Sequence, residues 1–177
     1  MANLDIQPLG RLNFQWSQFD WYDKKSAICY AWKKRSHMAI AQMNWGRMLF
    51  PLDHPRMAEF SESLDGIYGL ADRHQGFIWR IRDVDAATQL QALGFDNMLS
   101  ATVSVWETED ALREYTFRSL HGQFIDQKRE WFEAVEGPQL VIWNVDQDAQ
   151  PTFGEAFERL EILKVNGPSS AAYSWSH

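Results

Sequence analysis

Two kinds of periodicity alternate along most of the chain, and their order constrains the fold more than any other feature. Over Met38–Trp45, side chains alternate between two sets with the period of two that a β-strand requires. Apolar residues then recur at spacings of three and four over Met57–Ala71, which is typical of a helix that packs on a core. Asp53 is expected to cap this helix, with Pro55 in its first turn. The periodic part of the chain therefore begins with a strand and a helix.

Three further strands are predicted, each bounded by turn-forming or charged residues. They are expected at Phe77–Arg82, about Leu99–Trp106 and Gln139–Val145. The charged stretch Asp83–Asn97 between the first two is expected to be irregular. In the first of these strands, alternation places Phe77, Trp79 and Ile81 on one face. Arg80 is left on the opposite face.

Two further helices have recognisable beginnings. One begins at Thr108, which two acids follow in the first turn, and is expected to continue to about Phe132. The last helix begins at Thr152 and ends at Gly167, which a proline follows, the order expected of a helix stop. A short extended segment, Ala171–Trp175, comes after it. The order of elements is therefore strand, helix, strand, strand, helix, strand and one added helix.

This order is that of the ferredoxin-like fold, β-α-β-β-α-β, here with an added C-terminal helix. In such an α+β fold, helices are expected on only one face of an antiparallel sheet, which leaves the other face to be covered by something else. The sheet of a second copy is the simplest cover. The sequence thus predicts a homodimer in which two sheets form a dimeric α+β barrel.

The chain divides before His37. Residues 37–177 are predicted to form one domain, since a chain of 177 residues is long enough for a single core. Residues 1–36 carry aromatic side chains such as Phe14, Trp16 and Trp21 in a pattern that fits neither a strand nor a helix. This N-terminal extension has three interpretations: an arm packed on the domain or on a partner subunit, an unstructured tail, or a start of translation that truly lies near Met38.

Charge and hydropathy exclude several classes of function. The net charge of −7 repels phosphate backbones, so nucleic acid is not an expected partner. No stretch approaches the roughly 20 consecutive apolar residues of a membrane-spanning helix. The apolar run Ala27–Trp32 precedes its basic residues, the reverse of a signal peptide. With a single cysteine, Cys29, and no membrane partner, the protein is expected to be cytoplasmic.

An aromatic stripe surrounds one histidine on the helix predicted after Thr108. Spacings of four, three, four and three place five side chains on one helical face: Phe117, His121, Phe124, Lys128 and Trp131. Apolar surroundings keep an imidazole neutral by lowering its pKa, so His121 is a candidate base. The alternative is a half-buried structural histidine that hydrogen-bonds to a carbonyl or to an acid.

Two tryptophans on neighbouring predicted strands extend this aromatic set. Trp79 and Trp106 are expected to share the helix-covered face with Met43 or Trp45. Nine Trp and eleven Phe exceed what a small core needs, which indicates a slot for a flat molecule. The alternative is that these large side chains only fill space between the sheet and the helices.

Three polar side chains are candidates to orient a ligand: Asn44, Thr102 and Ser104. Arg80 is instead predicted to point to the interface between copies, where it pairs with Glu107 or with an acid of the partner. His74 is interpreted as a helix C-terminal residue. No pair of Cys or His has the spacing of a metal site, so no metal is expected.

Five short motifs resemble those of a known family. They are Ala41-Gln42-Met43-Asn44, Gly76-Phe77-Ile78-Trp79-Arg80, Ser104-Val105-Trp106-Glu107, Arg129-Glu130-Trp131-Phe132 and Arg159-Leu160 through Gly167-Pro168. In this order they resemble the bacterial family catalogued as domain of unknown function 3291, from about His37 to Trp175. That family is similar to the dimeric α+β barrel group, which includes antibiotic-biosynthesis monooxygenases and some haem-degrading enzymes.

Two positions depart from that family's pattern. Thr102 stands where the family often has an asparagine. Asp148-Ala149 stands where the family tends to carry Gly-His before the final Pro-Thr. If that asparagine and that histidine contribute to an activity, this chain has lost or altered it.

The resemblance implies two classes of function. In the first, the protein is a monooxygenase-like enzyme without a cofactor, acting on an aromatic or polycyclic substrate that is deprotonated to a carbanion; an isomerase or cyclase is equally consistent. His121 is then the base, and Asn44 or Ser104 binds the oxyanion. The aromatic residues that contact the substrate are Trp79, Trp106, Phe117, Phe124 and Trp131. In the second class, a non-catalytic dimer binds a small aromatic ligand or haem, with His121 as the haem ligand.

Overall fold

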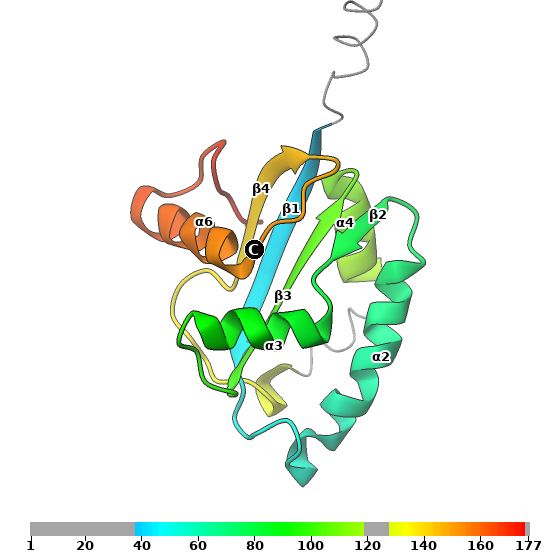
Figure 1. Ribbon diagram of the computed structural model, residues 1–177, viewed down its shortest axis with the longest axis vertical. Helices are drawn as coiled ribbons and strands as arrows, with labels where there is room; N and C mark the ends of the chain where they lie inside the picture. Colours follow the sequence, from blue (N-terminus) through cyan, green and yellow to red (C-terminus); the bar gives the residue numbers. More distant parts are fainter. Residues whose placement is uncertain (1–37, 119–127, 176–177) are drawn as a thin grey trace, which may run out of the picture. The chain divides into compact units, whose positions relative to one another are not determined.

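A four-stranded sheet is the centre of the fold (Figure 1). The structure, a computed structural model, describes residues 38–118 and 128–175. The strands are β1 (Met38–Arg47), β2 (Phe77–Arg80), β3 (Leu99–Trp106) and β4 (Leu140–Asp146). The helices in these ranges are α2 (Ala58–Asp72), α3 (Asp83–Ala92), α4 (Glu109–Arg118) and α6 (Phe153–Asn166), with 3-10 helices η1 (Pro55–Met57) and η2 (Lys128–Glu130). The fold is of the α+β class, as predicted.

The sheet is antiparallel throughout, in the order β2-β3-β1-β4. In β1, Gln42 is opposite Ser104 of β3 and Ile142 of β4. Two residues further along, Asn44 is opposite Thr102. Because successive side chains of a strand point to opposite faces, all of these residues belong to one face of the sheet.

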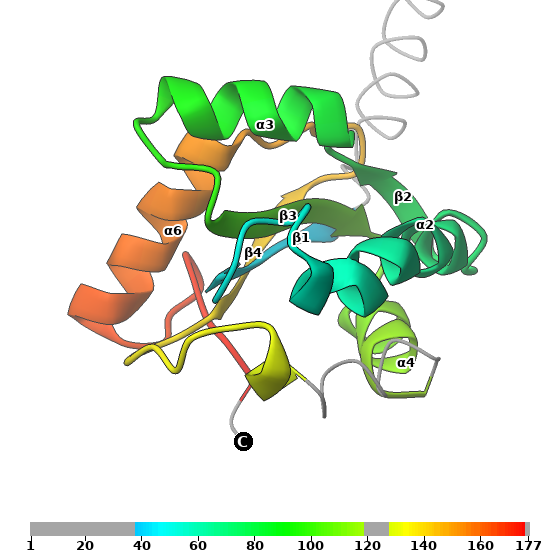
Figure 2. The same ribbon diagram turned by 90° about the horizontal axis from the view of Figure 1, so that it is seen from below.

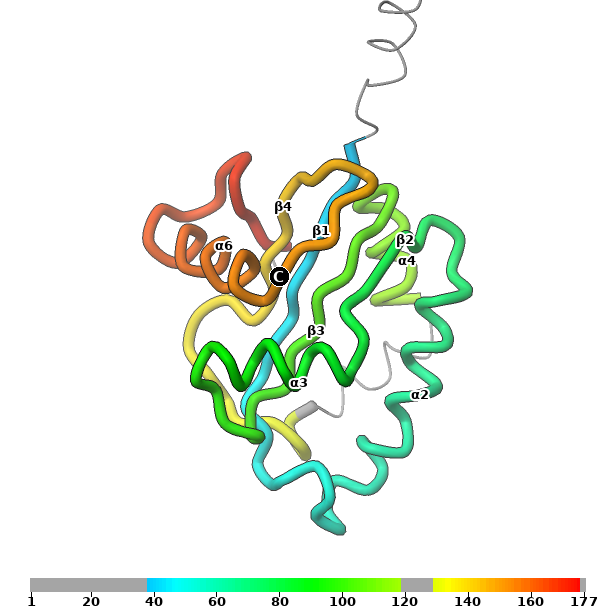
Figure 3. Tube along the Cα trace, viewed as in Figure 1, coloured from blue at the N-terminus to red at the C-terminus, as the bar shows by residue number. Residues whose placement is uncertain are grey.

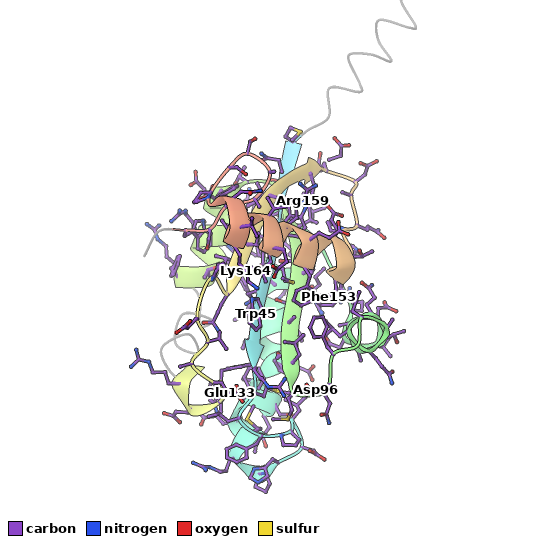
Figure 4. All side chains as sticks on the ribbon, turned by 90° about the vertical axis from the view of Figure 1, so that its left-hand side faces the viewer. Trp45, Asp96, Glu133, Phe153, Arg159 and Lys164 are labelled. Atoms are coloured by element: carbon purple, nitrogen blue, oxygen red, sulfur yellow. The ribbon has the colours of Figure 1, made fainter. Side chains whose placement is uncertain are left out.

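One face of the sheet is buried under α3 and α6, and we call it the α3/α6 face (Figure 2). Its core includes Ala39, Ala41, Met43, Val103, Val105, Val141 and Trp143 from the strands and Leu90, Phe153, Ala156, Leu160 and Leu163 from the helices. The backbone N–H of Phe153 donates to Gln89 Oε1 at 3.0 Å, which joins the start of α6 to α3. Figure 4 shows α6 on this face, where Lys164 Nζ lies 5.9 Å from the ring centroid of Trp45.

The opposite face is covered at its two ends, and we call it the α2/α4 face. At one end, Ile40 and Trp106 pack with residues of α2, α4 and the C-terminal segment. At the other end, Phe60 of α2 packs with Met57 and Trp131. Helix α2 therefore contributes to both apolar clusters, which lie on either side of the middle of the face.

The sheet thus carries helices on both faces, and the prediction of helices on one face only is wrong. The seven strand residues of the α3/α6 core named above are at most 1% exposed within a single chain, for example Met43 and Val105. The reason for expecting a second sheet on that face is therefore removed. The dimeric barrel itself stays a prediction.

Helix α3 lies in the stretch that was expected to be irregular, and that expectation is wrong. Its ten residues bury only Leu90, so no apolar stripe marks it. The N-cap residue, Arg82, makes no side-chain cap hydrogen bond. The acids Asp83 and Asp85 in the first turn are the local signal that favours a helix there.

Two predicted helix boundaries also differ. The residue that caps η1 is His54, whose Nδ1 accepts a hydrogen bond from the N–H of Arg56 at 3.2 Å, and not Asp53. Phe132 is not the end of a helix, because it forms a β-bridge with Met48. Of the long helix expected to begin after Thr108, the described residues form α4 and, at Lys128–Glu130, the 3-10 helix η2.

The faces of β2 differ from the prediction because the strand is irregular. Its register with β3 shifts between Phe77 and Trp79. Phe77 consequently packs with the α2/α4 cluster, whereas Trp79 and Ile81 pack in the α3/α6 core. A bulge of this kind moves a side chain to the other face, which strict alternation cannot predict.

The C-terminal segment returns along the edge strand β4 (Figure 3). Tyr173 and Ile142 exchange two backbone hydrogen bonds, of 2.7 and 2.9 Å. Trp175, which follows, is buried in the α2/α4 cluster. The segment therefore completes one end of the core.

The close approach of Phe132 to β1 gives a test of this packing. A Cβ added at Gly46 would lie 2.7 Å from Phe132 Cδ1, so we expect Gly46→Ala to lower the free energy of unfolding by about 1–3 kcal/mol. Gly66→Ala is the control, because a Cβ at that position in α2 meets nothing within 4 Å, and it should raise stability by up to about 1 kcal/mol. Urea unfolding measures both, and equal effects of the two variants would contradict the packing described.

Candidate functional site

The middle of the α2/α4 face carries four polar side chains on the two central strands. Gln42 and Asn44 come from β1, and Thr102 and Ser104 from β3. We call these four residues the polar row. The register places Gln42 beside Ser104 and Asn44 beside Thr102. A polar row between two apolar clusters is the arrangement in which a few oriented polar groups recognise a largely apolar ligand.

Ser104 is the centre of a buried hydrogen-bond network. Its Oγ accepts from Gln42 Nε2 and from Trp106 Nε1, each at 2.8 Å. Gln42 and Ser104 are both 7% exposed and Trp106 is 1% exposed. Because a hydroxyl oxygen has two lone pairs, both are used, and the remaining capacity of Ser104 is to donate its O–H.

Asn44 is the accessible end of the polar row. The Thr102 hydroxyl donates to Asn44 Oδ1, and Thr102 is half-buried. Asn44 itself is exposed, although it lies on a strand with neighbours on both sides. Within the described ranges, its Nδ2 donates to no protein group. An amide N–H pair therefore faces the surface at the centre of the sheet.

An aromatic cluster lies beside the buried end of the polar row. Trp106 stacks on Tyr115 at 5.0 Å between ring centroids and has Phe77 edge-on at 5.2 Å. Tyr115 also donates to the carbonyl of Ile67 at 3.2 Å, and burial raises the pKa of its phenol well above the ordinary value. Trp106 is therefore a buried core residue that also donates a hydrogen bond to Ser104.

His74 is a residue of this cluster that the sequence did not assign to the site. Its ring lies edge-on to Trp106 at 5.5 Å and to Tyr115 at 6.2 Å between centroids. Its Nδ1 lies 2.6 Å from the carbonyl oxygen of Gln75. The position at the end of α2 agrees with the interpretation as a helix C-terminal histidine, but only the antiparallel neighbour β3 brings Trp106 to it.

The predicted aromatic set is divided. Trp106 and Trp131 lie in the two clusters of the α2/α4 face, Trp131 at 2% exposure with Phe60 at 5.5 Å. Trp79 packs against the core of the opposite face, so the prediction that Trp79 and Trp106 share one face is wrong. The sheet itself separates them.

Three predicted residues remain: His121, Phe124 and Phe117. His121 and Phe124 fall outside the described residues. Phe117 is 52% exposed on α4, where its ring lies 5.2 Å from that of Trp175. Of the predicted site, the structure therefore brings together Asn44 and Ser104 on one face, with Trp106 beside Ser104.

Arg80 does not pair with Glu107, and that prediction is wrong. Its guanidinium bonds to Asp72 at 3.1 Å and to Asp83 at 3.5 Å. It also lies 4.2 Å from the ring centroid of Tyr68, whose pKa is raised to about 12 by burial and by the nearby Asp83. These contacts within one chain account for the arginine without a partner subunit.

Other features of the described residues give no competing site. A hollow of about 350 Å³ lies at the η1 end, lined by Pro51, Leu52, Asp53, Ser61 and Asn97, and it contains none of the predicted site residues. The described ranges hold no group of three His, Cys, Asp or Glu side chains that could bind a metal ion. They also hold no helix long and apolar enough to cross a membrane.

Glu109 holds the C-terminal segment against α4. Its carboxylate accepts from Tyr173 Oη at 3.0 Å, from Trp175 Nε1 at 2.7 Å and from Arg113 Nε at 3.0 Å. The Arg113 guanidinium lies 4.6 Å from the centroid of Trp175. Burial raises the pKa of Tyr173 to about 12, and its bond to Glu109 adds to this.

Comparison with known proteins gives a family but no activity. The sequence profile of the family described as Domain of unknown function (DUF3291) matches residues 39–177. No curated protein matches the chain. Among solved structures, this chain is similar to the crystal structure of a protein of unknown function from Nitrosomonas europaea, with 11% identity and a TM-score of 0.40, over 66% of this chain and 95% of that one.

The Glu109 cluster predicts a dependence of stability on pH. Burial opposes ionisation of this carboxyl, but the hydrogen bonds from Tyr173, Arg113 and Trp175 outweigh it and hold the pKa below its ordinary value. Since the folded pKa is the lower one, the stability contributed by the carboxylate is present above about pH 4.3 and is lost as the pH falls through the folded pKa.

We therefore expect Glu109→Gln to cost about 1 kcal/mol at pH 7, a value reduced for partial exposure of the side chain, and almost nothing near pH 3. Urea unfolding at both pH values measures this. Glu158→Gln is the control, because Glu158 is exposed on α6 and has no hydrogen bond or ion pair to any residue that the structure describes. A deficit of Glu109→Gln that is the same at both pH values would contradict the linkage.

Proposed function

This chain belongs to the family described as Domain of unknown function (DUF3291), and from that premise we propose that it is a small-molecule enzyme of monooxygenase-like type. The substrate is a planar aromatic or polycyclic compound that binds at the polar row. Asn44 and Ser104 hold its oxygen, and Trp106 lies beside them. His121 is the proposed base.

The observation that carries this proposal is the exposure of Asn44. A residue at the middle of a central strand, with β3 and β4 on either side, is normally covered in a sheet that has helices on both faces. Here the side chains that continue from Asn44 along β1 and β3 into the buried part of the face, Gln42 and Ser104, are polar. On β4, the residue opposite Asn44 is the partly buried Leu140. A surface amide that leads to a buried hydroxyl suits a ligand with an oxygen-bearing end.

The proposed chemistry needs a base and hydrogen-bond donors, not a cofactor. A base removes a proton from a ring carbon that is conjugated with a carbonyl group, and the charge moves to the carbonyl oxygen as an enolate. Donors placed at that oxygen stabilise the negative charge as it develops. The electron-rich carbanion then reacts with O₂, and loss of water leaves a new carbonyl group on the ring.

Two finer aspects of the fold belong to the same proposal. The order β2-β3-β1-β4 places β3 between β1 and β2, the two strands that α2 connects, and this supports a ferredoxin-like arrangement.

The homodimer stays a prediction, and the covered α3/α6 face argues against contact between two open sheets. Light scattering on the purified protein tests it: particles of two chains support the dimer, and particles of one chain contradict it.

One observation favours the alternative, a non-catalytic protein that binds a small aromatic ligand or haem. The polar row contains amides and hydroxyls only, so none of its four side chains titrates near neutral pH. The base that catalysis requires, and the axial ligand that haem requires, are both assigned to His121. Catalysis and haem binding are therefore tested on that residue.

Oxygen consumption with anthrone as the substrate tests the enzyme. Anthrone is a tricyclic ketone that readily loses a proton, and the balanced reaction converts anthrone and one O₂ to anthraquinone and one water. We expect turnover that falls at least tenfold in Asn44→Ala and in His121→Ala, since each loses an oxyanion donor or the base. Asn144→Ala is the control, because Asn144 is an exposed asparagine on neighbouring β4.

The results separate the two candidates. Binding of anthrone without oxygen uptake, unchanged in His121→Ala, would favour the non-catalytic protein. A Soret band after addition of haem that is lost in His121→Ala would favour haem binding. Absence of both binding and turnover would contradict the proposed function.

A further inference from the structure

Trp175 is held in the way that proteins hold a planar aromatic ligand. Its indole N–H donates to Glu109 Oε1 at 2.7 Å, and the Arg113 guanidinium lies 4.6 Å from the ring centroid. The ring of Phe117 lies 5.2 Å away, at 46° to the indole plane. An acceptor, a cation and an aromatic ring thus contact one flat group, a combination suited to a small-molecule site.

One helix supplies all three contacts. Glu109, Arg113 and Phe117 are spaced by four residues in α4, so they lie along a single stripe of the helix surface. Glu109 and Arg113 also pair with each other at 3.0 Å, a contact that does not depend on Trp175. The lining therefore persists when the indole leaves. We call the space along this stripe that Trp175 fills the indole slot.

The segment that carries Trp175 is anchored before it reaches the slot. Ala172 is fully buried in the α3/α6 core, whereas Trp175 packs in the α2/α4 cluster, so the segment crosses the edge of the sheet. Beyond Ala172, it is joined to β4 by the two backbone hydrogen bonds of the isolated bridge between Tyr173 and Ile142. A segment joined by one bridge opens locally at much lower cost than a strand of the sheet.

The indole slot adjoins the buried end of the polar row. Trp175, Trp106 and Ile142 belong to one apolar cluster. Ile142 is opposite Gln42 in the sheet, and Trp106 donates to Ser104. A polycyclic compound that displaces the indole therefore enters the cluster beside these two polar residues.

We infer that the indole slot is an aromatic subsite of the proposed binding site, and that Trp175 occupies it as an internal, displaceable ligand. The external ligand is a planar aromatic compound with an N–H or O–H group on its edge. A donor is needed because the Glu109 carboxylate only accepts, and a ring face is needed because the Arg113 cation lies over it. The inference rests on the proposed function for the site that the slot adjoins.

Indole itself is the first probe, and 1-methylindole is its matched control, since it keeps both rings but has no N–H. Calorimetry on Trp175→Ala, in which the slot is vacant, should show that indole binds at least tenfold more tightly than 1-methylindole. The natural protein should bind indole at least tenfold more weakly than Trp175→Ala, because its own side chain competes for the slot. Trp175→Phe keeps a ring but loses the bond to Glu109, so its affinity should lie between the two. Circular dichroism confirms that each variant is folded.

Hydrogen exchange on the natural protein tests the displacement without any substitution. At indole concentrations that occupy the slot, the amides of Ile142 and Tyr173 should exchange at least tenfold faster, because each donates to the other's carbonyl only while the segment is in place. The amides of β1 should exchange no faster. 1-Methylindole at the same concentration should leave the exchange at both positions unchanged.

The outcomes separate this inference from the proposed function. Absence of indole binding to folded Trp175→Ala and Trp175→Phe, or equal binding of the two probes, would overturn the subsite. Indole binding to the natural protein with unchanged exchange at Ile142 and Tyr173 would overturn the displacement of Trp175. Turnover of anthrone alongside either result would leave the proposed function standing. Confirmed binding in the slot without turnover of anthrone, in the natural protein and in Trp175→Ala, would overturn only the proposed enzyme.

Discussion

The register between β1 and β3 is the interaction on which the rest of this structure depends. It places Gln42 opposite Ser104 and Asn44 opposite Thr102, with small apolar residues alternating toward the other face. A shift of one residue would exchange the two faces and bury Asn44 among side chains such as Val105 in a core that offers it no partner. The same pairing therefore builds both the apolar core and the polar row.

Elements with a strong local pattern were predictable from the sequence. The bounds of β3 agree with the prediction, and α6 begins after Thr152 and ends at Gly167, whose φ is 72°. Helix α3 was not predictable in this way, because it buries a single residue, Leu90, and is held mainly by contact with α6. The helices that cover the α3/α6 face are set by tertiary packing, which the local periodicity of a sequence does not predict.

The candidate site was predictable only in part. Alternation sufficed to place Asn44 on one face of β1, and the register of β3 brought Ser104 to the same face. Alternation failed for Trp79, because the pairing of β2 with β3 is irregular and strict alternation does not predict such an irregularity. The place of His74 depends on a turn between α2 and β2 and on a ring from β3, so its neighbours emerge only in the folded chain.

The backbone bridge between Tyr173 and Ile142 has a consequence for how this protein meets other chains. An edge strand with unpaired amides is a template for additional strands, and β4 is such an edge. The C-terminal segment occupies that edge at Ile142, and Glu109 clamps the side chains of Tyr173 and Trp175. Removal of this segment would therefore leave the backbone of Ile142 as an open edge for strand-to-strand aggregation.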